Sequence, residues 1–351
     1  MEQYAVLAYR HDVPGDSVQG NNLPGRSQLF NKLCERDILP VVSQQAEAAI
    51  EGGAIQVHEL LDDEKGQIGA PRSVALANVG VIINRLDRSM KSGQIQRNDL
   101  LPPIINENAT RSLAFRKHRT DSEVLTPLGL SMPTTLVESA ADIESFLEAQ
   151  KALNIIVKPN SGTNSEGVTK LHRLAVIDHF VADTALYGEQ IIQVAHDFSV
   201  PFPSALRAYD AASQEAFTGW SQSLNPKELR VYGFHSPAGT AVLPVARAIA
   251  AGQDNWFFVD PDSVPERVME GTRAAMALTA KISGALAVYG TVDFGYGSDG
   301  INEPDWQAIE LNGRMPYLLG YDKHPAIADD LRNCLANQIK AAADARPVVE
   351  L

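Results

Sequence analysis

The stretch FGYGSDGINEPDWQAIELNGRMP at residues 294–316 constrains the fold more than any other part of the sequence. Its glycines spell G-x-G-x-x-G, but this pattern cradles a dinucleotide only between a strand and a helix. Pro304 interrupts an early helix, and the apolar run QAIEL follows it. The sequence therefore predicts a hairpin between the strands YGTVDF and WQAIELN. A dehydrogenase, which requires a helix after Gly300, is the outlying alternative.

Oxygen ligands converge on this predicted hairpin. Alternate side chains of a strand share a face, so Glu310 and Asn312 project to one side, where Asp293 of the partner strand can meet them. Two carboxylates and an amide oxygen suit Mg²⁺, with Mn²⁺ as an alternative ion. We predict a divalent-metal site at Asp293, Glu310 and Asn312.

A second glycine-rich stretch, KPNSGTNSEGVTKL at residues 158–171, predicts a phosphate-covering loop between two strands. Val168 stands where a Walker loop needs its lysine, which excludes that motif. Lys158 ends the preceding strand, from which its ammonium can reach phosphates beneath the loop. The alternative is a plain hairpin with a solvated lysine. The small residues that let the loop approach phosphates are Ser161, Gly162, Thr163, Ser165 and Gly167.

Three arginines occupy predicted strand positions. They are Arg230 in ELRVYGF, Arg247 in VARAIA, and Arg314 two residues after Asn312. The geometry of a guanidinium group matches phosphate and carboxylate oxygens. Arg314 lies two residues after Asn312, so its side chain should project to the same side of the strand as Glu310 and Asn312. Each arginine alone is typical of a protein surface, so their assignment to one cleft depends on the group.

Composition excludes several classes of partner. The formal charge of −13 argues against a nucleic-acid surface or an anionic membrane, because either requires a basic patch. Cys34 and Cys334 have no metal-ligand spacing. The N-terminus lacks a signal pattern, and no apolar run approaches the roughly 20 residues of a membrane span. We therefore expect a cytoplasmic protein.

The predicted elements divide the 351 residues into three units. Residues 1–105 alternate short strands with helical stretches, which predicts a small parallel α/β domain. Pro102 and Pro103 end this unit. Residues 106–189 contain the glycine-rich loop, and residues 190–351 contain the long strands, the hairpin and a closing helix.

In this order the motifs resemble those of the ATP-grasp ligases, over roughly residues 105–340. INENATRSLAFRKHRTDSEVLTPLG resembles the helix with the first ATP lysine, which Lys117 matches. NIIVKPNSGTNSEGV resembles the second lysine and its mobile loop, with Ser165 where a glycine is common. EQIIQVAHDF loosely resembles the adenine-binding hinge, which implies Gln193 and Val194. KELRVYGF, VARAIAAGQDNW and VDFGYG…QAIELNGRMP resemble the arginine strands and the metal hairpin.

The resemblance implies an α/β (α+β) ATP-grasp fold, in which the N-terminal domain precedes two α+β subdomains that clasp ATP. It also implies an ATP- and Mg²⁺-dependent ligase. A substrate carboxylate attacks the γ-phosphoryl group, and an amine attacks the resulting acylphosphate to give an amide, ADP and phosphate. Arg247 and Arg314 are the catalytic candidates that stabilise developing charge. Arg230 and Arg85, in VIINRLDRS, are candidates to hold the substrate.

Two further classes of function stay open. The same cradle could phosphorylate a small molecule as a kinase, or bind ATP without turnover as a regulatory module. Amino acids or a small peptide are the leading substrates. The identities of the carboxylate and the amine, the free, peptide-bound or carrier-bound state of the acceptor, and homodimer formation are left open by the sequence.

Overall fold

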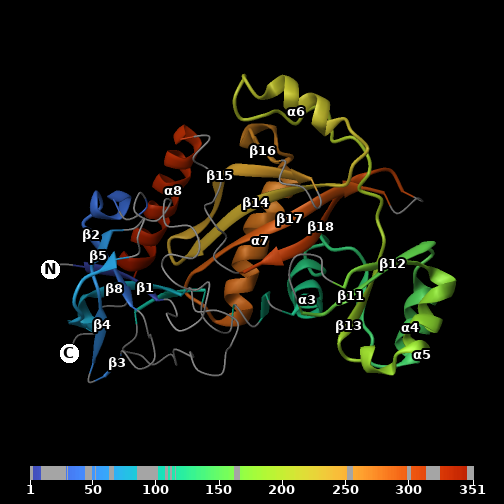
Figure 1. The fold of residues 1–351 in the computed structure, drawn as a ribbon, viewed down its shortest axis with the longest axis horizontal. Coiled ribbons are helices and arrows are strands. Elements are labelled where there is room, and N and C mark those ends of the chain that lie inside the picture. Colours follow the sequence, from blue (N-terminus) through green and yellow to red (C-terminus); the bar gives the residue numbers. More distant parts are fainter. Residues whose placement is uncertain are drawn as a thin grey trace.

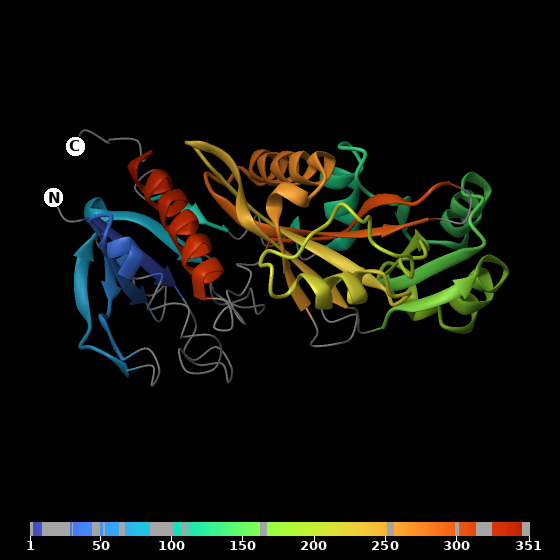
Figure 2. The ribbon, with the colours of Figure 1, turned by 90° about the horizontal axis from the view of Figure 1, so that it is seen from above.

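Three principal β-sheets follow one another along the long axis of the molecule (Figures 1 and 2). They belong to a computed structural model of the chain. This structure describes residues 3–8, 29, 31–43, 50–51, 53–62, 67–84, 102–106, 110, 113–114, 116–161, 167–250, 256–298, 302–313 and 325–345.

The N-terminal sheet is parallel, in the order β2-β1-β8-β9, as the first 105 residues predict. Its strands are apolar because side chains on both faces are buried. Short antiparallel strands between β2 and β8 are a departure from the predicted alternation of strands and helices. The bounds are β1 Gln3–Ala8, β2 Ile38–Ser43, β3 Ile50–Glu51, β4 Ala54–Val57, β5 Leu60–Asp62, β6 Gln67–Ile68, β7 Arg72–Ala75, η1 Leu76–Asn78, β8 Val79–Asn84 and β9 Ile104–Ile105.

The second sheet is antiparallel, in the order β10-β13-β11-β12, and α4 and α5 cover its outer face (Figure 1). Helix α4 begins where the Asp142 carboxylate accepts the Ser139 backbone N–H at 2.7 Å. The bounds are α3 Lys117–Thr120, the π-helical turn η2 Asp121–Leu125, β10 Thr134–Leu136, α4 Ala140–Ala149, β11 Asn154–Pro159, β12 Thr169–His172, η3 Arg173–Ala175, α5 Val176–Ala182, η4 Thr184–Leu186 and β13 Gln190–Val194.

The central sheet is antiparallel, in the order β16-β15-β14-β17-β18, and α7 packs on one face. Its last two strands form the hairpin that the sequence predicts, and residues 305–312 are a strand, which excludes the dehydrogenase alternative. Helix α7 ends at Gly284, whose φ of 67° is left-handed. The bounds are α6 Gln214–Ser221, β14 Lys227–Ser236, β15 Gly239–Ala250, β16 Trp256–Val259, η5 Pro261–Ser263, α7 Glu266–Ser283, β17 Val288–Gly297 and β18 Asp305–Asn312.

The first two glycines of the G-x-G-x-x-G pattern make room for the segment that follows β13. A Cβ atom on Gly295 would lie 2.3 Å from the Phe198 ring, and one on Gly297 would lie 2.3 Å from the Asp197 carbonyl oxygen. Backbone hydrogen bonds join Asp197 and Ser298 in both directions, at 2.7 and 3.3 Å. The glycines therefore allow close packing of this segment against β17 of the central sheet.

We predict that Gly295→Ala lowers the free energy of unfolding by about 1–3 kcal/mol, because the new methyl group must displace the Phe198 ring. Urea denaturation measures this loss. Gly219→Ala is the control, since a Cβ atom there meets nothing within 4 Å and the position lies inside α6. An unchanged stability of Gly295→Ala would contradict the packing role, and Phe198→Ala in the same chain should restore part of the loss.

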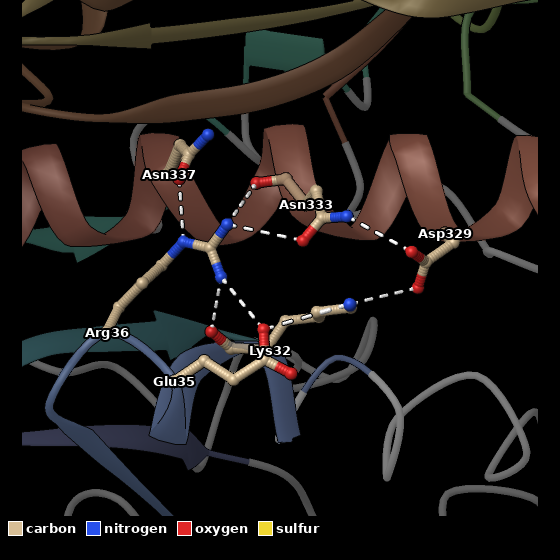
Figure 3. A network of polar contacts seen from close by, with 6 residues as sticks. All are labelled: Lys32, Glu35, Arg36, Asp329, Asn333 and Asn337. Carbon is tan, nitrogen blue, oxygen red and sulfur yellow. Dashed lines mark hydrogen bonds and ion pairs between the residues drawn. The ribbon is translucent and has the colours of Figure 1, made fainter.

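The C-terminal helix α8, Pro325–Asp344, packs between the N-terminal and central sheets (Figure 2). Leu33 and Ile83 of the N-terminal part share one buried core with Tyr232 of β14 and Leu335 of α8. Polar contacts seal the edge of this core: Arg36 Nε donates to Asn337 Oδ1 at 2.6 Å, and Lys32 lies 3.2 Å from Asp329 (Figure 3). None of the described helices has the length and apolar character needed to cross a membrane.

Candidate functional site

A row of charged residues crosses the central sheet from strand to strand. Arg230 of β14 lies opposite Asp293 of β17, and Asp293 lies opposite Glu310 of β18. Arg247 of β15 occupies the register position opposite Arg230. Leu229, next to Arg230 in β14, packs with the α7 core, so alternation turns Arg230 to the other face of the sheet.

Arg230 and Asp293 form a bidentate ion pair in this row. Arg230 Nε donates to Asp293 Oδ1 at 2.7 Å, and Nη2 donates to Oδ2 at 2.6 Å. Asn312 Nδ2 also donates to Asp293 Oδ2, at 3.0 Å. Burial lowers the pKa of Arg230, but the Asp293 carboxylate outweighs burial and raises it. The structure thus brings Asp293, Glu310 and Asn312 together, with Arg230 bound to the first of them.

Lys158 approaches this row from the second sheet. Its side chain is 6% exposed, and its Nζ donates to Gln193 Oε1 at 2.8 Å. Gln193 Nε2 in turn donates to Thr134 Oγ1 at 2.8 Å. Burial lowers the pKa of Lys158, while the carboxylates of Asp121 and Glu310 raise it. Because Lys158 and Glu310 act on each other's pKa, the ammonium of this lysine lies near the carboxyl group of Glu310.

Lys117 joins the same site from the start of α3. Its backbone N–H donates to the Asn160 carbonyl oxygen at 2.8 Å, and the His118 N–H donates to Asn160 Oδ1 at 3.0 Å. Asn160 therefore fixes the beginning of α3 to the end of β11. The Lys117 ammonium is close enough to lower the pKa of Glu310. The two predicted ATP lysines consequently lie near each other and near the acidic hairpin.

Two carboxyl groups of the site escaped the sequence analysis. Burial raises the pKa of Glu228 to about 7, with Asp293 raising it further and Arg230 lowering it. Burial also raises the pKa of Asp121 to about 6, although Lys158 opposes this. Glu228 lies two residues before Arg230, so both side chains lie on the same face of the strand. Asp121 lies four residues after Lys117, which is about one helical turn. These spacings are the signals that could have identified them.

The raised pKa of Glu228 predicts a pH-dependent stability. The folded protein holds this proton up to about pH 7, above the ordinary value of 4.5, so stability falls as the pH rises between these values. We expect Glu228→Gln to be more stable than the wild type at pH 8, on the order of 1–3 kcal/mol, with the difference shrinking towards pH 5. Denaturation in EDTA measures it, with the exposed Glu148→Gln as control. A pH-independent difference would contradict this assignment.

Several predicted site residues lie outside the described residues and are therefore left out of the site. Of the predicted phosphate-covering loop, the described residues are Ser161, on the β11 side, and Gly167, whose φ of 71° is left-handed. The Val194 N–H donates to the Pro133 carbonyl oxygen at 3.0 Å, so it and the Gln193 side chain already have protein partners. The residues outside are Arg85, Gly162, Thr163, Ser165 and Arg314, and the Arg247 side chain.

The donor set of the hairpin fits a divalent cation that is shared with substrate phosphates. Among the described residues, no group of three or more His, Cys, Asp and Glu side chains forms a metal site by itself. Burial and the neighbouring Asp293 raise the pKa of Glu310, so a cation would relieve repulsion between the two carboxylates. Mg²⁺ commonly takes one or two carboxylates and completes its shell with water and phosphate oxygens.

No protein-family model and no curated protein matches the chain, whereas solved structures match nearly its whole length. D-alanine-D-alanine ligase from Coxiella burnetii is 11% identical, with a TM-score of 0.56 over 98% of this chain and 96% of its own. VanG D-Ala:D-Ser ligase from Enterococcus faecalis is 12% identical, with a TM-score of 0.55 over 99% and 100%. A RiPP-associated ATP-grasp ligase from Chryseobacterium gregarium, solved with ADP and a leader and core peptide, is 10% identical, with a TM-score of 0.53 over 96% and 97%. At these identities the likeness is one of fold.

Proposed function

The chain has the ATP-grasp fold, and from this premise we propose that it is an ATP- and Mg²⁺-dependent ligase that joins a carboxylate to an amine, with release of ADP and phosphate. The observation that carries the proposal is the site between two sheets. The charges of Lys117 and Lys158 lower the pKa of Glu310, Glu310 lies opposite Asp293 in the hairpin register, and Asn312 donates a hydrogen bond to Asp293. Cationic and acidic groups in one buried place suit a metal-bound triphosphate.

In this proposal the basic and the acidic residues of the site have different roles. Lys117 and Lys158 neutralise and orient phosphate oxygens, and the small residues after Lys158 bring backbone N–H groups to the same oxygens. Mg²⁺, held by Asp293, Glu310 and Asn312, would neutralise phosphate charge when bound. Arg230 holds the Asp293 carboxylate in place through two hydrogen bonds. Substrate binding by Arg85 and Arg230 is part of the same proposal.

The proposed reaction has two displacements. A substrate carboxylate oxygen forms a bond to the γ-phosphorus while the bond to the ADP oxygen breaks. The amine nitrogen then forms a bond to the acyl carbon, loses a proton, and phosphate leaves. Arg247 and Arg314 would stabilise the charge that develops on the phosphoryl group and then on the tetrahedral oxyanion. Exclusion of water is necessary because an acylphosphate otherwise hydrolyses.

Amino acids or a small peptide are the proposed substrates. Support comes from the similar folds, which include ligases for D-alanine and D-serine and a ligase solved with a peptide. Residues 1–105, 106–189 and 190–351 are the proposed N-terminal, central and C-terminal units, with α8 returning from the last unit to the first. A cytoplasmic location and small-molecule partners belong to the same proposal.

A phosphate-release screen with ATP, Mg²⁺ and pairs of amino acids tests the proposed activity. A ligase should release ADP only when both a carboxylate and an amine are present, and hydroxylamine should trap the acylphosphate as a hydroxamate. ADP release with a stable phosphorylated product and no need for an amine would instead indicate a kinase. ATP binding without turnover by any pair would indicate a regulatory module.

A further inference from the structure

The buried ammonium group of Lys158 has an uncharged side chain as its partner. Within the described part of the chain, its one hydrogen bond is the 2.8 Å contact of Nζ with Gln193 Oε1. The carboxyl groups of Asp121 and Glu310 are near enough to raise the pKa of Lys158, but neither of these described residues forms an ion pair with it. A buried charge without an opposite charge in contact is costly, so this arrangement favours an anionic ligand.

Gln193 is itself held by a chain of hydrogen bonds. Its Nε2 donates to Thr134 Oγ1 at 2.8 Å, and the Thr134 hydroxyl donates to the Met132 carbonyl oxygen at 2.9 Å. Because Thr134 uses its proton for Met132, it can only accept from the amide, and the Gln193 oxygen must then turn towards Lys158. The sheet register sets this geometry, since Thr134 of β10 lies opposite Gln193 of β13, and Gln193 lies opposite Ile156 of β11.

An uncharged acceptor suits a lysine whose charge is needed by a ligand. A carboxylate in the place of Gln193 would also hold the ammonium, but it would offset the positive charge and repel phosphate oxygens. An amide oxygen takes one of the three ammonium protons and leaves the charge and two protons for the ligand. The oxygen and the nitrogen of the Gln193 amide are both used within the protein, in place of the contact with adenine that the resemblance implies.

We propose that Gln193 is a positioning residue, which holds the ammonium group of Lys158 towards the phosphates of the nucleotide without neutralising its charge. The inference rests on the proposed nucleotide site and adds the residue that orients one of its lysines. Gln193 acts through Lys158, so its replacement should change what the phosphate groups contribute to binding and leave the contribution of the nucleoside unchanged. A hydrogen bond to a charged group is worth roughly 10- to 100-fold in affinity, which sets the size of the effect.

The first test compares a charged and an uncharged ligand on the full-length chain. ADP with Mg²⁺, or adenosine, displaces a fluorescent ATP analogue from the wild type and from Gln193→Glu. We expect Gln193→Glu to weaken ADP at least about tenfold, because the new carboxylate pairs with Lys158, and to change adenosine less than about twofold. Unchanged affinity for ADP, or equal weakening of ADP and adenosine, would overturn the inference.

Gln222→Glu is the matched control for this test. Gln222 follows α6, and its Nε2 donates to the Phe202 carbonyl oxygen at 3.1 Å, so the control replaces a hydrogen-bonded glutamine in another part of the chain. We expect it to leave the affinities for ADP and adenosine unchanged. A loss of ADP affinity equal to that of Gln193→Glu would show a general effect of added negative charge and would overturn the inference.

A double-mutant cycle tests whether Gln193 acts through Lys158. Gln193→Met removes the acceptor of the ammonium, and we expect it to weaken ADP at least about threefold when Lys158 is present. In the Lys158→Met background the same replacement should change the affinity for ADP by less than about 1.5-fold, because no ammonium is left to position. Equal losses in the two backgrounds would overturn the inference.

The two proposals fail in different ways. If the wild type binds neither ATP nor ADP, the proposed ligase function fails. If it binds both, and the Gln193 variants weaken adenosine as much as ADP, Gln193 contacts the nucleoside and only the inference about its positioning role fails. Gln193→Glu keeps an acceptor for Lys158, so it decides the question even if Gln193→Met does not fold.

Discussion

Glu310→Gln should reduce turnover on the order of 10²- to 10³-fold while the fold stays intact. Glu310 is the carboxylate of the hairpin that is not neutralised by the bidentate contact of Arg230 with Asp293. Its replacement by an amide removes the negative charge that the proposed metal requires. Initial rates of ADP release under saturating substrates measure the effect.

Stability separates this loss from unfolding. Burial and Asp293 raise the pKa of Glu310, so its charge is unfavourable in the metal-free fold. Glu310→Gln should therefore unfold at the same or higher urea concentration than the wild type in EDTA. Glu303→Gln, at an exposed position two residues before β18, is the control and should keep normal rates. Near-normal turnover by Glu310→Gln would remove Glu310 from the proposed metal site.

Arg230→Met should destabilise the protein by about 3–5 kcal/mol, because it leaves the Asp293 carboxylate buried without its cation. The Asp293 side chain is 4% exposed, and both of its oxygens contact Arg230. Glu228 and Glu310 lie close enough to Asp293 for its carboxylate to raise the pKa of both. Urea denaturation in EDTA measures the loss.

Two variants test whether the loss comes from the unpaired charge. Asp293→Asn combined with Arg230→Met should recover most of the stability, since the carboxylate left without its cation is then removed. Arg207→Met removes an arginine of the same kind from an exposed pair with Asp260, at 2.7 Å, and should cost less than about 1 kcal/mol. Equal losses in Arg230→Met and Arg207→Met would contradict the assignment. Addition of Mg²⁺ should stabilise Arg230→Met more than the wild type.

The sequence predicts the backbone of the site better than its side-chain contacts. Strand alternation is a local property, so the sequence of the hairpin predicts that Asp293 meets Glu310 and Asn312 on one face. Pro304 and the apolar run that follows it distinguish that hairpin from a nucleotide-binding turn. The ATP-grasp fold was identified from the order of these motifs, and the similar solved structures confirm it.

Contacts between distant segments could not be predicted in the same way. Asp121 is close enough to Lys158 for the ammonium to lower its pKa, and the hydrogen bonds of Asn160 connect the start of α3 to the end of β11. The role of Gly295 depends on Phe198, which is far away in the chain. Burial is also the largest cause of the raised pKa of Glu228, and burial is a property of the folded chain as a whole. These properties arise from tertiary packing and not from local sequence.

The central claim is that one site between Lys158 and the hairpin binds ATP together with a divalent cation. Calorimetric titration of the full chain with a non-hydrolysable ATP analogue, with and without Mg²⁺, tests it most directly. We expect saturable binding at one site that weakens at least about tenfold without Mg²⁺ in the wild type, and that is insensitive to Mg²⁺ in Glu310→Gln. Absence of binding, or binding with the same Mg²⁺ dependence in both proteins, would contradict it.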